Sequence, residues 1–275
     1  AFVSDAFAED AFHVVRFQGK EGLSRLFEFT VTLVSEKDDL DAGQALQNPA
    51  RLLMRRDQDW TPFHGVLKSF SVVQKVDAYT FYQAVLVPRL WRLTLNRDSQ
   101  IFLDKNVEQF CREILEQGRI TSEDAGFRLS GDYAAWPFVC QYNESHYDFL
   151  ERWFSRDGLY YFFEHGQGRD VLVVTDSAMA HTPLPGGGEL HYAEPSALDG
   201  PHVETQVRAF AKNRRTIPRK VLLRDYHYEN PSEGVQAEAV ADPKGCGEVY
   251  VYGEHVRHAS EAERLAKVRA ESLAC

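Results

Sequence analysis

The sequence predicts a mostly β protein in which two β regions flank an α/β insert. Residues 1–97 repeatedly alternate apolar and polar side chains, as strands with one buried face do, and this alternation returns within residues 186–275. Residues 98–185 instead carry helical periodicity and one expected hairpin. We therefore expect three segments with these boundaries: a first β domain, an α/β segment, and a second, incomplete β domain with a terminal helix.

The first β region contains three alternating runs. In residues 27–34, F-E-F-T-V-T-L-V, every second side chain is apolar, which predicts a strand with one buried face. Residues 63–73 and 79–87 form two further runs, and Q-K-V-D-A between them suits a hairpin connection. Pro88 ends the last run because proline cannot donate to a strand ladder. Short strands at this spacing are typical of a small barrel or sandwich.

The middle segment begins with a predicted helix. Residues 106–118, N-V-E-Q-F-C-R-E-I-L-E-Q-G, offer Asn106 as the N-cap and Gly118 as the C′ residue. The apolar stripe of this helix comprises Val107, Phe110, Cys111, Ile114 and Leu115. Because Cys111 lies on that stripe, we interpret it as a small core residue rather than a nucleophile.

Residues 143–165, N-E-S-H-Y-D-F-L-E-R-W-F-S-R-D-G-L-Y-Y-F-F-E-H, predict a second helix that leads into a β-hairpin. Ser145 and Asp148 form an S-x-x-D capping pattern, and Gly158 stands where the helix ends. The apolar face of the helix is expected to consist of Phe149, Leu150, Trp153 and Phe154. The role of these residues is then structural.

The hairpin after this helix is expected to hold it in place. Tyr160 and Phe162 are the side chains we expect to lock the helix against the hairpin, and residues 171–176 supply the returning strand. Four acids lie close in sequence and are the candidates for a hydrolytic carboxylate pair: Glu144, Asp148, Glu151 and Glu164. Capping and a solvated helix face explain them more simply than catalysis does.

A Pro/Gly-rich connector, residues 181–191, leads into the second β region. Alternating runs follow at residues 203–210, 221–228 and 248–252. Residues 260–274 predict a closing helix, in which Ser260 and Glu263 form a capping box and Glu263 pairs with Lys267.

Composition excludes several classes of protein. The net charge of −10 argues against nucleic acid as a partner, and the basic run at residues 212–220 lacks the aromatic side chains on which bases would stack. No apolar run reaches the roughly 20 residues that span a bilayer, so stable membrane insertion is not expected. The first ten residues show no signal-peptide pattern, which favours a cytoplasmic protein or export without a cleaved signal.

The sequence carries no strong motif for chemistry. His255 and His258 lack the H-E-x-x-H order of a zinc protease, and His181 and His191 flank a connector that would hold a metal poorly. The four cysteines are scattered without a C-x-x-C pair. No G-x-S-x-G elbow or phosphate-binding loop is present. We therefore expect no enzyme activity, no cofactor and no metal.

Five segments, in order, carry a resemblance to a known family. They are E-G-L-S-R-L-F-E-F-T-V-T-L-V-S, F-H-G-V-L, D-S-Q-I-F-L-D-K-N-V, the long stretch V-C-Q-Y-N-E-S-H-Y-D-F-L-E-R-W-F-S-R-D-G-L-Y-Y-F-F-E-H, and L-R-D-Y-H-Y-E-N-P. Together they resemble the VgrG (Vgr/Rhs) spike proteins of bacterial type VI secretion systems, over nearly the whole chain.

The resemblance implies a fold similar to the central hub of contractile phage baseplates, with two small β-barrel domains joined by helix-containing segments. It further implies a structural protein: a homotrimer that seats on a hexameric tube protein and carries a puncturing needle and effector proteins. Such a protein is cytoplasmic before firing and is then secreted by the type VI apparatus.

Family members continue into a needle that these 275 residues do not contain. We therefore expect a truncated or degenerate copy whose trimer is weakened. Two other functions stay open. A cell-wall carbohydrate-binding or hydrolytic module would expose Tyr160 and Tyr161 and depend on Glu164, and a general adaptor would bind effector proteins.

Overall fold

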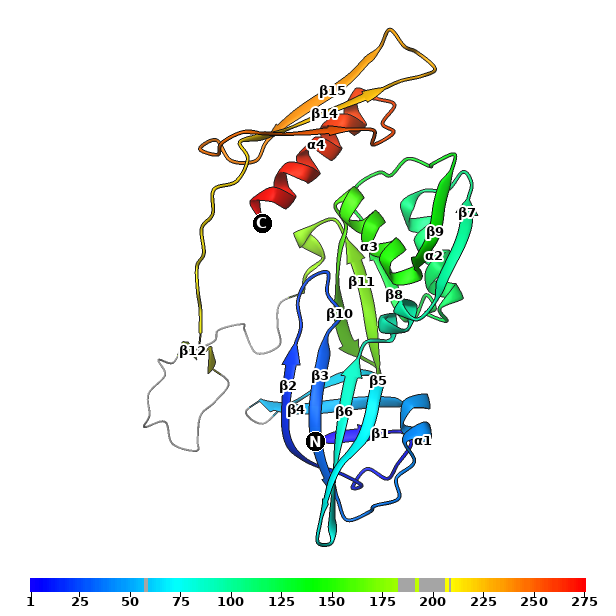
Figure 1. The fold of residues 1–275 in the computed structure, drawn as a ribbon, viewed down its shortest axis with the longest axis vertical. Coiled ribbons are helices and arrows are strands. Elements are labelled where there is room, and N and C mark those ends of the chain that lie inside the picture. Colours follow the sequence, from blue (N-terminus) through cyan, green and yellow to red (C-terminus); the bar gives the residue numbers. More distant parts are fainter. Residues whose placement is uncertain (57–58, 183–190, 193–205, 208) are drawn as a thin grey trace. The chain divides into compact units, whose positions relative to one another are not determined.

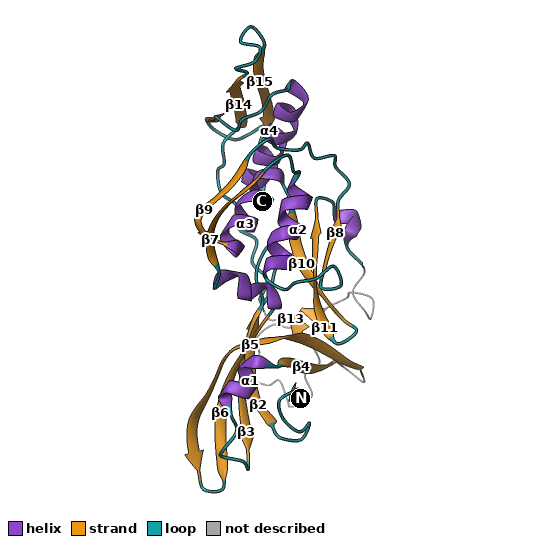
Figure 2. Ribbon diagram, turned by 90° about the vertical axis from the view of Figure 1, so that its right-hand side faces the viewer, coloured by secondary structure: helices purple, strands orange, loops and turns teal. Residues whose placement is uncertain are grey.

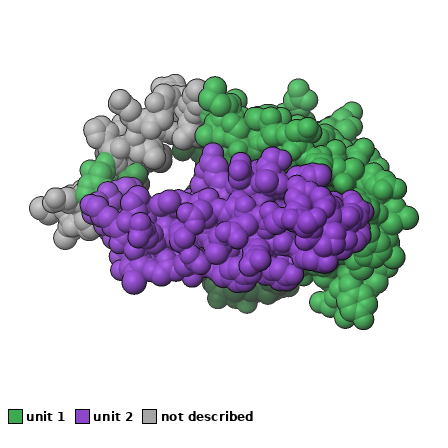
Figure 3. All heavy atoms as spheres, turned by 90° about the horizontal axis from the view of Figure 1, so that it is seen from above, with its two compact units in different colours: residues 1–151, 160–208 green, residues 152–159, 209–275 purple. Residues whose placement is uncertain are grey.

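The computed structural model describes residues 1–56, 59–182, 191–192, 206–207 and 209–275. They divide into two compact units, coloured separately in Figure 3. The first unit comprises Ala1–Glu151 and Tyr160–Arg208, and the second comprises Arg152–Leu159 and Ala209–Cys275. The chain is mostly β with some helices, as the sequence predicts.

The first unit begins with a six-stranded antiparallel sheet, curled like half a barrel (Figure 1). The strands follow the order β1-β4-β5-β6-β3-β2. Their bounds are β1 (Phe2–Ser4), β2 (His13–Lys20), β3 (Glu28–Ser35), β4 (Pro49–Arg56), β5 (Asp59–Val76) and β6 (Tyr79–Val87), and the short helix α1 (Ala42–Gln47) precedes β4.

The sequence identifies the central strands of this sheet correctly. The run at 27–34 is β3, in which every second side chain is buried. The expected hairpin is β5–β6, but β5 continues to Val76, so that only Asp77 and Ala78 form the turn. Asp77 has φ +50°, a left-handed conformation that aspartate tolerates in tight turns.

Strand β5 forms the corner of the sheet. Its residues 59–66 pair with β4 and residues 66–76 pair with β6, and two register shifts interrupt the second ladder. Such bulges bend a strand and increase its twist. Gly65 lies where the pairing changes, and a Cβ there would overlap the carbonyl oxygen of Val87. The glycine of F-H-G-V-L therefore permits the close strand approach on which the curl depends.

Aromatic side chains fill the core of this sheet. The ring of Phe12 meets those of Phe2, Phe70 and Tyr82 edge-on, with centroids 5.9, 5.9 and 6.0 Å away. The Tyr82 side chain is fully buried, and its hydroxyl donates to the carbonyl of Lys37 at 2.9 Å. Burial of large rings with a satisfied hydroxyl is a strong stabilising contribution.

The α/β insert contains two small sheets with two helices between them (Figure 2). Strands β7 and β9 form a ribbon, and β10-β11-β8 form a sheet in which β11 and β8 run parallel. The element bounds are η1 (Arg89–Thr94), β7 (Arg97–Phe102), α2 (Val107–Gln117), β8 (Ala125–Arg128), β9 (Val139–Ser145), α3 (His146–Asp157), β10 (Tyr160–Gly166), β11 (Arg169–Thr175) and η2 (Ala178–Ala180).

Helix α2 begins as the sequence predicts. Asn106 Oδ1 accepts from the Gln109 amide at 3.0 Å, and Gln109 Oε1 accepts from the Asn106 amide at 2.9 Å. This reciprocal capping box satisfies two amides that have no partner within the helix. All five residues of the predicted stripe are buried, including Cys111.

The end of α2 differs from the prediction. Gly118 is the C-cap with φ −79°, and the left-handed C′ residue is Arg119 with φ +60°. The Ile120 amide donates to the Leu115 carbonyl, as in a Schellman motif. Gly118 is needed for another reason, because a Cβ there would overlap the side chain of Leu93.

Most of the second unit is a three-stranded sheet with one face covered by a helix. The sheet has the order β15-β14-β16, with β14 (Lys220–Tyr226), β15 (Gly234–Val240) and β16 (Glu248–Tyr252), and the helix is α4 (Ala259–Ala274). The core consists of Leu223, Val235, Ala237, Val256, Ala262, Leu265 and Ala266. The runs at 221–228 and 248–252 correspond to β14 and β16. The sequence missed β15, whose alanine, glutamine and glutamate have weak strand preference.

The predicted start of α4 is wrong. The N-cap is His258, which makes no side-chain capping bond, so Ser260 lies inside the helix. The chain enters the helix at a point fixed by the Val256 amide, which donates to the Asp225 carboxylate at 2.9 Å. Lys267 pairs with Glu271 at 3.7 Å rather than with Glu263, the partner expected from the sequence.

Two predictions fall largely outside the described residues. Of the connector at 181–191 and the strand at 203–210, the structure describes the ends and the short parallel pair β12 (His191–Tyr192) and β13 (Gln206–Val207). In the basic run, residues 212–218 form neither helix nor strand.

Candidate functional site

The predicted site residues lie on and around helix α3. Ser145 ends β9 and precedes the helix, and its Oγ accepts from the Asp148 amide at 3.0 Å. Gly158 follows the last helical residue with φ +75°, and the Leu159 amide closes the turn onto the Phe154 carbonyl at 2.8 Å. The left-handed backbone there favours glycine.

The apolar face of α3 is buried along its length. Phe149, Leu150 and Phe154 are 0, 1 and 2% exposed, and Trp153 is 6% exposed. In the first unit, the Phe149 ring lies 5.6 Å from that of Phe102. A helix whose apolar residues are all withdrawn from water contributes packing rather than a binding face.

The hairpin β10–β11 meets α3 through a different residue from those expected. The Tyr161 hydroxyl lies 2.9 Å from the Tyr147 hydroxyl of the helix, and Tyr161 is 1% exposed. Burial raises the pKa of both phenols, that of Tyr147 to about 12. Both groups are therefore neutral hydrogen-bonding groups at neutral pH.

Tyr160 and Phe162 alternate with Tyr161 along β10 and lie on the other face of the strand. Their rings lie 5.7 and 4.8 Å from that of His181, and the Tyr160 hydroxyl is 3.0 Å from His181 Nε2. Since side chains alternate along a strand, one residue of offset decides which rings meet the helix.

The end of α3 carries charge pairs that the sequence did not reveal. Asp157 is 3% exposed, and its Oδ1 lies 2.9 Å from Arg264 of α4 and 2.9 Å from its neighbour Arg156. Glu254 pairs with Arg156 at 3.4 Å and with Arg269 at 2.8 Å. These contacts all lie within the second unit, where they fix the helix end to α4.

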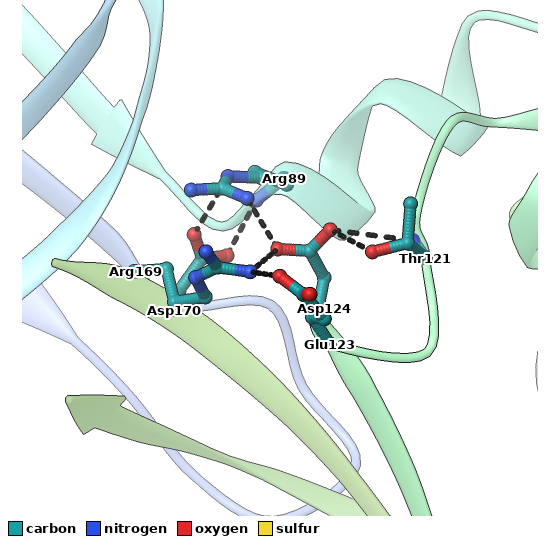
Figure 4. A network of polar contacts seen from close by, with 6 residues as sticks. All are labelled: Arg89, Thr121, Glu123, Asp124, Arg169 and Asp170. Atoms are coloured by element: carbon teal, nitrogen blue, oxygen red, sulfur yellow. Dashed lines mark hydrogen bonds and ion pairs between the residues drawn. The ribbon is translucent and has the colours of Figure 1, made fainter. Parts of the chain in front are cut away.

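A second network of buried charge occupies the first unit (Figure 4). Arg89, just after β6, forms ion pairs with both Asp124 and Asp170. The Arg89 amide donates to Asp170 Oδ2 at 2.8 Å, and Arg89 Nε lies 3.3 Å from Oδ1 without the alignment of a hydrogen bond. The Asp170 side chain is 2% exposed, and burial raises its pKa to about 6.

The outer part of this network holds Asp124 in place. Its Oδ2 accepts from the amide and the hydroxyl of Thr121 at 3.2 and 2.9 Å. Arg169 pairs with Glu123 at 2.7 Å and lies 3.5 Å from Asp124. Figure 4 shows the carboxylates of Asp124, Asp170 and Glu123 turned toward the guanidinium groups of Arg89 and Arg169. The arrangement connects the insert to the first sheet. Because Asp124 and Asp170 both pair with guanidinium groups, they are not available as the acid and the base of a hydrolase.

Exposed apolar side chains gather on the outer faces of two small sheets. The β7–β9 ribbon and its ends expose Ile101, Leu103, Phe138 and Tyr142. The β14–β16 sheet exposes Tyr226, Val240, Tyr250 and Tyr252 on the face opposite the core. Exposed apolar patches are common at protein–protein interfaces.

Within the described parts of the chain, no group of histidine, cysteine and acidic residues could hold a metal ion. Among the same residues, no helix is both long and apolar enough to cross a bilayer. The four cysteines are free thiols.

The chain matches a known family. A family model described as the phage tail baseplate hub (GPD) matches residues 20–275. The chain is 29% identical over 270 residues to the type VI secretion system spike protein VgrG1a of Pseudomonas aeruginosa, covering 96% of this chain and 41% of that protein. The chain therefore spans less than half the length of this curated relative.

Solved structures show the same fold. An E. coli component of the type VI secretion system, itself structurally similar to the T4 bacteriophage tail proteins gp27 and gp5, aligns with a TM-score of 0.62 at 23% identity, covering 66% of this chain and 50% of that one. A Francisella PdpA–VgrG complex aligns with a TM-score of 0.51 at 12% identity, covering 88% of this chain and 36% of that one. The chain thus belongs to the phage tail baseplate hub family and is homologous, over nearly its whole length, to the VgrG spike proteins of type VI secretion systems.

Proposed function

We propose that this chain is the hub of a secretion spike, in which three copies close into a ring that seats on a hexameric tube and carries a needle and effectors. The observation that carries the proposal is the match to the baseplate hub family over residues 20–275. That family is structural and non-enzymatic, so the chain acts by assembly rather than by bond-making.

The proposal divides the chain into two small barrel domains, residues 1–97 and 186–275, joined by the α/β segment 98–185. The curled first sheet supports this division, as does the return to strands in β14–β16. In the described part of the chain β2 pairs with β3 alone, which leaves its other edge open. Open edges are available to neighbouring copies in a ring.

The structural core residues support a scaffold role for α3. Ser145, Asp148 and Gly158 delimit the helix, and the buried Phe149, Leu150, Trp153 and Phe154 anchor it, as described above. We propose that this helix is a structural element of the hub, while the outer apolar faces of β7–β9 and β14–β16 meet other proteins.

The proposed partners are a second and third copy of the chain, the tube protein, and effector proteins. The Francisella relative in complex with PdpA supports a further protein partner for this fold. The net charge of −10 gives no support for a nucleic-acid partner. We propose that the protein is cytoplasmic before firing and is then secreted without a cleaved signal peptide.

The carbohydrate-binding or hydrolytic alternative has less support. It requires solvent-facing Tyr160 and Tyr161, but Tyr161 is 1% exposed and Tyr160 stacks on His181. It also requires a free Glu164, whose two oxygens instead accept from Arg128 at 2.8 and 2.7 Å.

Light scattering over a concentration range tests the ring. We expect a version extended through the needle segment of the family to have the mass of a trimer, and the 275-residue chain to be a monomer or a weak trimer. A monomeric extended chain at every concentration would refute the ring.

Surface variants test whether the β7–β9 ribbon takes part in this association. Tyr142→Ser removes a side chain that is 78% exposed on the ribbon, so it should weaken association and leave the fold intact. The matched control is Met179→Ser, at a residue that is 91% exposed away from the ribbon.

A further inference from the structure

A groove in the first unit is not used by any of the contacts above. It has a volume of about 470 Å³ and lies among α1, the middle of β5, η1 and the end of α2. Its lining residues include Leu46, Leu67, Lys68, Trp91, Arg92, Leu95 and Arg119. A hollow of this size accommodates several side chains of a bound segment.

Part of the lining of the groove is apolar. Leu46, Leu67, Trp91 and Leu95 contribute to it. Leu95 is 66% exposed and Leu46 is 38% exposed, whereas many other leucines of the fold are buried. Leucine and tryptophan side chains left facing water in a hollow can bury apolar area when a partner covers them.

The charged residues that line the groove are all basic. They are Lys68, Arg92 and Arg119, and no acidic residue lines it. Lys68 pairs with Glu28 at 3.0 Å, but Arg92 and Arg119 form no ion pair within the described parts of the chain. On a protein with net charge −10, the two arginines therefore place positive charge without an ionic partner beside the groove.

The backbone of Arg119 shows that the fold itself does not require this arginine. Its φ of +60° is the left-handed conformation that costs a residue with a Cβ but costs glycine nothing. At the C′ position of a Schellman motif glycine is the usual residue. Arg119 thus keeps an exposed guanidinium beside the groove at a position where glycine would cost the backbone less.

We propose that this groove docks an acidic segment of a partner protein, one that carries an apolar side chain between its carboxylates. The apolar side chain would lie over Trp91 and Leu95, and the carboxylates would each accept paired hydrogen bonds from Arg92 and Arg119. Tryptophan and arginine side by side in a hollow are the residues that dominate binding energy at interfaces. The proposal stands independently of whether three copies form a ring.

Fluorescence anisotropy with a labelled peptide, Glu-Glu-Leu-Phe-Glu-Glu-Leu, tests the proposal on the full 275-residue chain. We expect saturable binding that weakens as salt is raised, and about tenfold weaker binding for Arg119→Gly and for Arg92→Ser. Arg119→Gly is the decisive variant. Because it relieves the left-handed strain, its thermal stability should be unchanged or higher, and lost binding cannot be attributed to unfolding.

Matched controls separate the groove from general charge attraction. Arg25→Gly removes another exposed arginine outside the groove and should leave the affinity unchanged. Leu95→Ser should weaken binding without loss of stability, because the side chain is mostly exposed.

Three results would overturn the proposal. The first is an acidic peptide that shows no saturable binding or binds no tighter than its lysine counterpart. The second is an Arg25→Gly variant that weakens binding as much as Arg119→Gly. The third is an Arg119→Gly substitution that leaves peptide binding unchanged and only lowers the solution mass of the chain measured without peptide. The occupant of the groove would then be a second copy of the chain. Light scattering on the extended chain tests the ring separately.

Discussion

Gly65 offers the sharpest test of how the first sheet curls. The substitution Gly65→Ala places a Cβ against the Val87 carbonyl oxygen, well inside the 3.0 Å that real Cβ atoms keep. The obstacle is backbone, which cannot rotate away as a flexible side chain would. The strand pair must therefore separate at the point where β5 changes partners.

The magnitude follows from the hydrogen bonds that this separation disturbs. A displacement of roughly half an ångström lengthens backbone hydrogen bonds of about 2.9 Å toward the limit of useful geometry. Losing one or two such bonds costs about 1 kcal/mol each, and overpacking strain adds about 1–3 kcal/mol. Alanine also lowers the conformational entropy of the unfolded chain, which stabilises the folded state by about 0.4–1 kcal/mol. We expect a net loss of about 1–3 kcal/mol in the free energy of unfolding.

Urea unfolding followed by tryptophan fluorescence measures this loss as a lower midpoint at constant slope. Gly126→Ala is the matched control, because Gly126 also lies in a strand and no atom stands within 4 Å of a Cβ built there. That variant should be as stable as the parent chain or slightly more so. If Gly65→Ala were as stable as Gly126→Ala, the close approach of β5 to β6 would be refuted.

Three further predictions concern the insert. Asn106→Ala removes one half of the capping box with Gln109 and should cost about 0.5–2 kcal/mol, measured by thermal unfolding; an unchanged midpoint would contradict the cap. Trp153→Ala empties a site that is 6% exposed and should cost about 3–5 kcal/mol, so a fully stable variant would disprove the buried face of α3. Burial and the neighbouring His64 lower the pKa of His165 to about 4, below its ordinary 6.5, so the folded state binds fewer protons than the unfolded chain between these values. Stability from this group should rise with pH across that window, and His165→Gln, which removes the group, should show a smaller rise in melting temperature over pH 4–6.5.

Local pattern was sufficient where one element carries its own signal. The alternation of β3 and the helical stripe of α2 each determine which face is buried, because period 2 and period 3.6 place apolar side chains on one side. The cap at Asn106 could be read in the same way, since its hydrogen-bond partner is three residues away. Pattern failed where boundaries depend on distant contacts: the start of α4 follows the Val256–Asp225 bond, between residues 31 positions apart.

In the candidate site, too, local pattern predicts the elements, and contacts between distant residues decide which side chains meet. The aromatic content of β10 is evident in the sequence, but whether Tyr160 or Tyr161 meets α3 depends on a one-residue offset that only the folded hairpin fixes. Nothing in the spacing of Arg89 and Asp170 marks them as partners, and they meet across 81 residues of chain.

The sequence by itself therefore determined the mostly β class, the helices of the insert, the burial of their apolar faces and the family resemblance. These rest on short-range periodicity and on ordered motifs, which are present in the chain before it folds. Tertiary structure decided the curl at Gly65, the buried ion pairs of Arg89 and Asp157, and the cationic groove around Arg119. Each of these joins residues from different elements, because electrostatic pairing and close packing depend on distance in space and not on distance along the chain.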